Sequence, residues 1–186
     1  VCLLLTSVSV TGFAQLQNPN TDWFRDAKYG VIHHYLPEMQ NDISANGTTD
    51  WNNSVNSFNV ETYAESAAEM GVGYVIFTLG QNSGYYCSPN SVYEEYAGYD
   101  TGTKCSKRDL PMELSEALSK KGIKLMLYLP SNVGKTDRFA AQNFGLTGAT
   151  NGSDFIVNEQ FAVKWAEVIQ EWAERYQDKI AGWWFD

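Results

Sequence analysis

Four short apolar segments alternate with amphipathic segments along this chain, and that alternation is the strongest constraint on its fold. The apolar segments cover residues 29–35, 73–78, 123–129 and 180–185. Between them, apolar residues recur at helical spacing within 59–70, 109–122 and 158–176. Nearly continuous apolar strands separated by helices are typical of a parallel sheet that is covered on both faces. The sequence therefore predicts an α/β protein with the order β-α-β-α-β-α-β.

The boundaries of the three helical segments carry their own signals. Residues that can cap a helix precede all three, namely Asn59, Asp109 and Asn158. Gly71 and Gly122 follow the first two segments and predict where those helices end. The stretches that remain are predicted to be loops: 37–57, 80–108 and 132–154. The loop at 80–108 contains five tyrosines, and a loop of that length in a compact domain is usually functional.

Polar side chains stand at the end of every apolar segment. In chain order they are His33 and His34, Gln81 and Asn82, Ser131 and Asn132, and Asp186. Polar groups at the carboxyl ends of successive parallel strands are how a (β/α) barrel builds an active site. Neither a GxGxxG turn nor a phosphate-binding loop occurs, which disfavours a doubly wound nucleotide-binding sheet. We therefore predict a (β/α)8 barrel of TIM type, of which this chain covers about the first four β/α units.

Asp186 follows two tryptophans and a phenylalanine, and it is the candidate nucleophile. An ionised carboxylate at the end of an apolar strand is costly unless it is paired or used. It could form a covalent glycosyl intermediate, or it could simply cap the next loop. A retaining glycosidase also needs a second carboxyl group ~5–5.5 Å away, which we expect beyond Asp186. The acidic residues on the predicted loops, Asp42, Asp50, Glu94 and Glu95, are more simply interpreted as solvated charges.

His33 and His34 are the only two histidines. Because neighbouring side chains of a strand point to opposite faces, only one of them can point into the barrel. Divergent histidines without a nearby carboxylate at ligand spacing argue against a metal site, and no cofactor is predicted. A Ser-His-Asp device is also disfavoured, because no Gly-x-Ser-x-Gly turn is present.

The charge and aromatic content limit the class of partner. The net charge is −9 and there is no basic run, which argues against nucleic acid and against an anionic membrane surface. Aromatic residues make up 14% of the chain. Many of them are expected in the core, but tyrosine and tryptophan also line sugar sites, where their faces stack on C–H surfaces. A neutral oligosaccharide or glycoconjugate is therefore the predicted partner, while the oligomeric state is left open.

Residues 1–14 resemble the remnant of a secretory signal peptide. A short apolar run is followed by small residues up to Ala14, and cleavage there would leave Gln15 first. The run is too short to span a bilayer. Residues 15–186 would then be the N-terminal half of a secreted or periplasmic catalytic barrel. In an exported chain, Cys87 and Cys105 could form a disulfide within the loop that holds both, or they could remain free thiols.

Four segments in order resemble the α-L-fucosidases of glycoside hydrolase family twenty-nine. Residues 23–35 resemble the first strand of that family, and His34 takes the position of its sugar-binding histidine. Residues 71–78 and 108–128 resemble the second and third units. The ending Trp183-Trp184-Phe185-Asp186 resembles the Trp-Phe-Asp of the family, whose aspartate is the nucleophile.

The chain departs from that family after the second strand. The family carries His-His-Asp-Gly-Phe there, whereas this chain has Gln81-Asn82-Ser83-Gly84-Tyr85. The resemblance implies that Asp186 attacks the anomeric carbon. It also implies a sugar contact from His34, with Gln81 and Asn82 in place of the histidines. Tyr85 and Trp184 are further candidate sugar contacts, because aromatic faces stack on the C–H surfaces of sugars.

The predicted function is that of an exported retaining glycosidase that removes terminal α-L-fucosyl or related deoxysugar residues. Two alternatives remain. One is a barrel that binds glycans without cleaving them, and the other is a glycosidase of another specificity, such as a galactosidase.

Overall fold

A four-stranded parallel sheet forms the centre of the molecule. The computed structural model describes residues 17–39, 48–134, 136–146 and 158–186. The strands are β1 (Gly30–His33), β2 (Tyr74–Thr78), β3 (Lys124–Leu129) and β4 (Gly182–Phe185), and they lie side by side in chain order. Every neighbouring pair is parallel. The predicted parallel sheet is therefore confirmed, and all four strands end at the same edge.

The register of the strands sorts their side chains onto two faces. Thr78 stands opposite Tyr128, which in turn stands opposite Trp184. Because side chains alternate along a strand, these three lie on one face, and Asp186 follows two residues after Trp184 on the same face. The alternate residues point the other way, and those of the two central strands include the fully buried Phe77 and Leu127.

Three helices pack on that second face and complete the hydrophobic core. They are α3 (Val60–Glu69), α5 (Leu110–Ser119) and α7 (Glu159–Tyr176). The predicted caps are present: the side chains of Asn59, Asp109 and Asn158 each accept a backbone N–H, at 2.9–3.1 Å. Such a cap is worth about 1 kcal/mol. The apolar stripe predicted on α7 is core, with five buried members: Phe161, Trp165, Val168, Trp172 and Tyr176.

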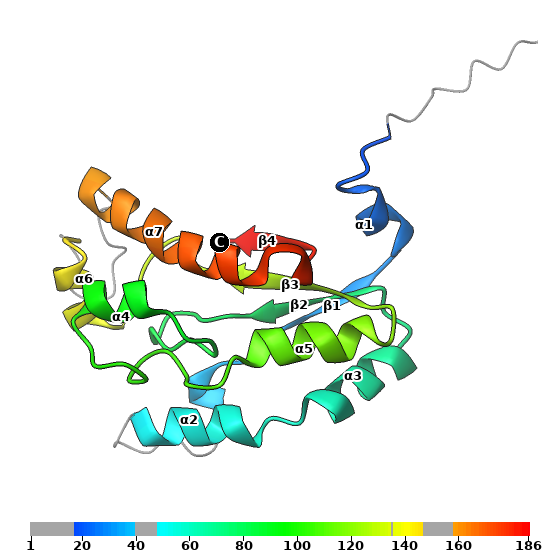
Figure 1. Ribbon diagram of the computed structural model, residues 1–186, viewed down its shortest axis with the longest axis horizontal. Helices are drawn as coiled ribbons and strands as arrows, with labels where there is room; N and C mark the ends of the chain where they lie inside the picture. Colours follow the sequence, from blue (N-terminus) through cyan, green and yellow to red (C-terminus); the bar gives the residue numbers. More distant parts are fainter. Residues whose placement is uncertain (1–16, 40–47, 135, 147–157) are drawn as a thin grey trace, which may run out of the picture.

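Each of the three segments predicted to be a loop contains a further helix, so that part of the prediction is wrong. The helices are α2 (Thr48–Ser57), α4 (Ser91–Ala97) and α6 (Arg138–Asn143). The sequence of α2 is rich in Asn, Thr and Ser, which are poor helix formers, but burial of Trp51 and Val55 four residues apart overrides that propensity. Figure 1 shows all three helices at the end toward which the strand arrows point.

The opposite end of the sheet is partly closed by α1 (Asp22–Asp26). The ring of Phe24 lies 4.7 Å from the ring of Tyr74, at the start of β2. Two short 3-10 turns, Pro37–Met39 and Gln177–Lys179, complete the described elements. Within the described residues, no helix is both long enough and apolar enough to cross a bilayer. The proposed signal segment, residues 1–14, lies outside the described residues.

The face of the sheet away from α3, α5 and α7 is exposed at the two edge strands, β1 and β4. Ile32 on β1 and Trp184 on β4 are each 48% exposed on it. Among the described residues, each edge strand pairs on one side only, and the backbone groups on its other side favour pairing with other chains. In a closed barrel this face is filled by side chains from all the strands.

We therefore expect residues 15–186 expressed alone to aggregate or to fold only in part. Size-exclusion chromatography and thermal denaturation followed by circular dichroism would test this expectation. A monomer with one sharp and reversible thermal transition would contradict it, because such a monomer would need no further cover for the exposed face and the two edges.

Candidate active site

Tyr128 is the centre of a cluster at the carboxyl ends of the strands. Its hydroxyl donates a hydrogen bond of 2.7 Å to Oδ2 of Asp186 and accepts one of 3.3 Å from Nε2 of Gln81. The imidazole of His34 packs edge-on against the Tyr128 ring, with centroids 5.5 Å apart. The structure therefore brings three of the predicted site residues, His34, Gln81 and Asp186, around one tyrosine.

Strand pairing fixes the position of Asp186. Its backbone N–H donates to the carbonyl of Leu129 at 3.1 Å, and its carbonyl accepts the N–H of Ser131 at 2.6 Å. The parallel pairing of β3 and β4 thus continues one residue past each strand. The side chains of Asp186 and His34 are both exposed at this edge. A carboxylate held in this way can be reached by a ligand from solvent.

The proton of the Tyr128 hydroxyl is firmly held. Burial raises the pKa of Tyr128 to about 12, and the hydrogen bond to Asp186 and its negative charge add to that effect. The phenol is therefore neutral at physiological pH and can serve as a donor to the carboxylate. Oε1 of Gln81 is buried and has no partner within the described part of the chain. That oxygen is an available acceptor beside the cluster.

The two histidines have separate surroundings, as the alternation along a strand predicts. His33 points to the helix-covered face, where its ring centroid lies 5.2 Å from that of Phe77 and 5.3 Å from that of Tyr63. Burial lowers the pKa of His33, and the neighbouring His34 lowers it further. His33 is thus a half-buried residue that packs against the core and not a member of the cluster around Tyr128. In the described part of the chain, no three His, Cys, Asp or Glu side chains come together as a metal site.

The lowered pKa of His33 predicts a pH dependence of stability. The unfolded chain, with an ordinary pKa of about 6.5, takes up this proton more readily than the folded chain. The free energy of unfolding should therefore fall as the pH drops below about 6.5. We expect His33→Phe to flatten this dependence in urea denaturation of the full-length protein between pH 7 and pH 5.

The control for that measurement is His34→Phe, which should keep most of the dependence because burial of His33 is the larger cause of its shift. Equal pH dependence in wild type and His33→Phe would show that His33 does not titrate differently on folding.

The other predicted sugar contacts lie around the cluster or apart from it. Trp184 is on the same face as Tyr128 and stands opposite it in the sheet. Asn82 is exposed beside Gln81, and its carbonyl accepts both the N–H and the hydroxyl of Thr136 at 3.0 Å. Tyr85 packs on Lys104, whose Nζ is 4.1 Å from the ring centroid, and not on Tyr128. Tyr85 is therefore set apart from the cluster.

The disulfide predicted between Cys87 and Cys105 is not formed. Both residues are free, buried thiols. The backbone of Cys105 pairs with that of Tyr86 in an isolated parallel β-bridge. Because side chains alternate along an extended segment, the side chain of Cys87 points to the opposite side from those of Tyr86 and Cys105. Sγ of Cys87 instead donates to the carbonyl of Thr78 at 3.4 Å. Burial raises the pKa of both thiols, which makes them poor nucleophiles.

Two of the acidic residues considered as a second catalytic group, Glu94 and Glu95, do not join the cluster. Glu94 is buried, which corrects its interpretation as a solvated charge. Its carboxylate accepts the backbone N–H groups of Gly102, Lys104 and Cys105 at 2.9–3.1 Å and so holds the loop that follows α4. Glu95 is exposed on α4. Asp42 and the side chain of Asp50 lie outside the described residues.

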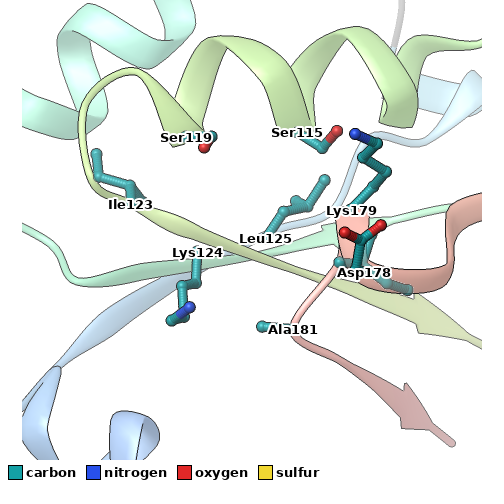
Figure 2. A pocket seen from close by; sticks show the side chains of 9 residues that line it. Ser115, Ser119, Ile123, Lys124, Leu125, Asp178, Lys179 and Ala181 are labelled. Carbon is teal, nitrogen blue, oxygen red and sulfur yellow. The ribbon is translucent and has the colours of Figure 1, made fainter.

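A separate hollow of about 150 Å³ lies at the other end of the sheet. Figure 2 shows Ser115 and Ser119 of α5 on one side of it, with Asp178 and Lys179 of the turn before β4 nearby. Ile123 and Ala181 place it beside the starts of β3 and β4, whereas Asp186 follows the end of β4. In a (β/α) barrel that end generally serves stability, and the cluster around Tyr128 is the better candidate site.

Sequence reasoning missed Tyr128 itself. It lies within the apolar run of β3, where an aromatic residue is expected in the core. The available signal was its hydroxyl, which is the only side-chain polar atom between Leu125 and Leu129. Ser131 and Asn132, the polar residues that the sequence places at the end of this segment, follow after the strand has ended.

Parallel strands in chain order, with polar groups gathered at their carboxyl ends, define the class of (β/α)-barrel enzymes. The sequence model of the α-L-fucosidase family matches residues 46–186. The chain therefore belongs to the α-L-fucosidase family.

Solved structures with the same fold include α-L-fucosidases from two bacteria. One from Bacteroides thetaiotaomicron, of glycoside hydrolase family twenty-nine, has a TM-score of 0.59 at 20% identity, over 95% of this chain and 42% of its own. A structure of a Bacteroides thetaiotaomicron enzyme trapped as a covalent intermediate has a TM-score of 0.57 at 20% identity, over 95% and 43%. The Lactobacillus casei enzyme with α-L-fucose product has a TM-score of 0.56 at 18% identity, over 91% and 62%.

These structures show the fold of the chain. It is part of a (β/α)8 barrel of TIM type, as the sequence predicts, and it spans less than two thirds of each of these enzymes. No curated protein sequence matches the chain.

Proposed function

We propose that this chain is the nucleophile-bearing part of an exported retaining glycosidase. Its substrates would be oligosaccharides or glycoconjugates that end in an α-L-fucosyl or related deoxysugar residue. The observation that carries the proposal is the exposed carboxylate of Asp186, held 2.7 Å from the Tyr128 hydroxyl beside the ring of His34. Family membership supports the choice of sugar.

In the proposed reaction, the Asp186 carboxylate attacks the anomeric carbon of the sugar. The new C–O bond forms as the bond to the leaving oxygen breaks, and that oxygen takes a proton from a general acid. Water then attacks the same carbon, returns its proton to that group and frees Asp186. The covalent intermediate trapped in a structural neighbour supports this double displacement. We expect the general acid to be a carboxyl group beyond Asp186 in the full-length protein.

The surrounding residues would orient the reactants. The hydrogen bond from Tyr128 occupies Oδ2 of Asp186, which aims Oδ1 as the attacking oxygen. His34 and Gln81 flank the proposed position of the sugar, where hydroxyl groups could bond to the imidazole and, once the Gln81 side chain turns outward, to its buried and unpartnered Oε1. Trp184, half exposed on the same face, offers a flat apolar surface for a C–H face of the ring.

The direct test is Asp186→Asn in the full-length protein, with an aryl α-L-fucoside as substrate. Loss of the nucleophile should lower kcat at least about a thousandfold. The matched control is Asp178→Asn, which removes an exposed carboxylate from the opposite end of β4 and should leave kcat unchanged. If Asp186→Asn hydrolyses the substrate at the wild-type rate, Asp186 is not the nucleophile.

The exchange of the family's histidine pair for Gln81 and Asn82 favours the two alternative functions. An amide side chain bonds hydroxyl groups but cannot carry charge. A panel of aryl glycosides separates the fucosidase from a glycosidase of another specificity, because kcat/KM would then be higher for another sugar, such as a galactoside. Calorimetry that detects binding of fucose without turnover of any substrate would support a glycan-binding barrel.

Export is a separate part of the proposal and is supported by the sequence of residues 1–14. We expect the mature protein to begin at Gln15, because signal peptidase cleaves after small residues such as Ala14. Mass spectrometry of the N-terminal peptide, after expression of the full-length protein in its own host, measures this. A mature protein that retains residues 1–14 would contradict export by this route.

A further inference from the structure

A buried ion pair joins the loops that follow β2 and β3. Nζ of Lys104 lies 2.7 Å from Oδ2 of Asp137, and their side chains are only 12% and 3% exposed. The Tyr99 hydroxyl donates to both oxygens of Asp137, at 2.8 and 3.0 Å, and the backbone N–H of Ala140 donates to Oδ1. The Lys104 ammonium also rests 4.1 Å from the Tyr85 ring centroid. Both charges are therefore almost completely surrounded by protein.

The loop that carries Asp137 is in direct contact with the turn formed by Gln81 to Gly84. A Cβ atom added at Gly134 would lie only 2.3 Å from the backbone nitrogen of Gly84, so the two backbones touch. Thr136 bonds the carbonyl of Asn82 twice. The turn is closed by the Gly84 N–H, which donates to the carbonyl of Gln81 at 2.9 Å. Movement of the Asp137 loop would therefore displace this turn.

The same turn delivers Gln81 to the candidate site. The amide of Gln81 donates to Tyr128, and Tyr128 donates to Asp186. A continuous series of contacts thus runs from the buried ion pair, through the Gln81–Gly84 turn, to the carboxylate. The long side chain of Gln81 has several rotatable bonds, so its position depends on where the turn holds its backbone.

We propose that Lys104 and Asp137 are positioning residues, which touch no substrate but set the place of Gln81 by clamping the two loops together. The inference rests on the proposed glycosidase function for its kinetic consequence. Breaking one side of the pair leaves a buried charge without its partner, and the loops must then shift to hydrate it. Lys104→Met is the cleanest change, because Asp137 keeps its bonds to Tyr99 and Ala140.

A double-mutant cycle between Lys104 and Gln81 tests the proposal in the full-length protein. Lys104→Met should lower kcat/KM for an aryl α-L-fucoside about 10- to 100-fold. A shift of a site residue by about 1 Å can cause a loss of that size. In a Gln81→Ala background, the same change should cost less than about twofold, because the side chain that it positions is gone. Equal losses in both backgrounds would show that Lys104 does not act through Gln81, and would overturn the proposal.

Hydrogen exchange gives a second measurement that needs no substrate. Lys104→Met should speed exchange of the backbone amides at Gly84 and Thr136 at least about tenfold, while amides of α5 keep their wild-type rates. The matched control is Lys120→Met, which breaks an exposed pair with Glu61 and should change neither. Unchanged exchange at Gly84 and Thr136 would overturn the proposal.

The two measurements separate this inference from the proposed function. If no aryl glycoside is hydrolysed by the wild-type protein, the glycosidase proposal fails, while faster exchange in Lys104→Met alone would still support the clamp on the Gln81 turn. If hydrolysis is normal and both the cycle and the exchange rates show no coupling, only the clamp is wrong.

Discussion

The parallel pairing of neighbouring strands in chain order is the constraint on which the rest of the structure depends. It brings every strand end to one edge, so residues far apart in the sequence become neighbours without any special loop. Tyr128 and Asp186 are separated by 58 positions, yet their side chains share a 2.7 Å hydrogen bond. The register of the strands decides to which face of the sheet Asp186 points. A slip of one residue would turn its side chain toward the helices and bury it among apolar side chains.

Buried carboxylates hold the loops at that edge in place. Glu94 accepts backbone N–H groups on both sides of a tight turn, and Asp137 combines a helix cap with an ion pair. Both side chains are almost inaccessible to solvent, and each is supplied with several donors, which is the condition for keeping a charge inside a protein. The described parts of the loops that carry residues 102–105 and 137–140 are therefore held by several hydrogen bonds, although they lack the continuous hydrogen bonding of the sheet.

The sequence predicted most of the scaffold, because the scaffold depends on local signals. Asn59, Asp109 and Asn158 cap their helices as expected, and the stripe on α7 is core. The same local reasoning failed for α2, whose polar residues favour a loop until Trp51 is buried against the ring of Tyr35. It also failed for the cysteines, since proximity in sequence says nothing about the direction in which each thiol points.

The candidate site was predicted in part for the same reason. Strand ends are visible in a sequence, so His34, Gln81 and Asp186 could be named together. Tyr128 could not be named, because its role depends on two features. The alternation of side chains along β3 sets the face to which it points, and the register between β3 and β4 places Asp186 beside it. The ion pair of Lys104 could not be predicted either, since its partner Asp137 lies 33 positions away in another loop.

The order of the strands has a consequence for how the protein is made. A chain that leaves the ribosome N-terminus first presents β1 to β2 and then β2 to β3, so each strand meets a partner that already exists. β4 docks after β3, and only at that step does Tyr128 receive the carboxylate it bonds. Asp186 therefore reaches this edge of the sheet after the strand ends that carry His34, Gln81 and Tyr128 are in place.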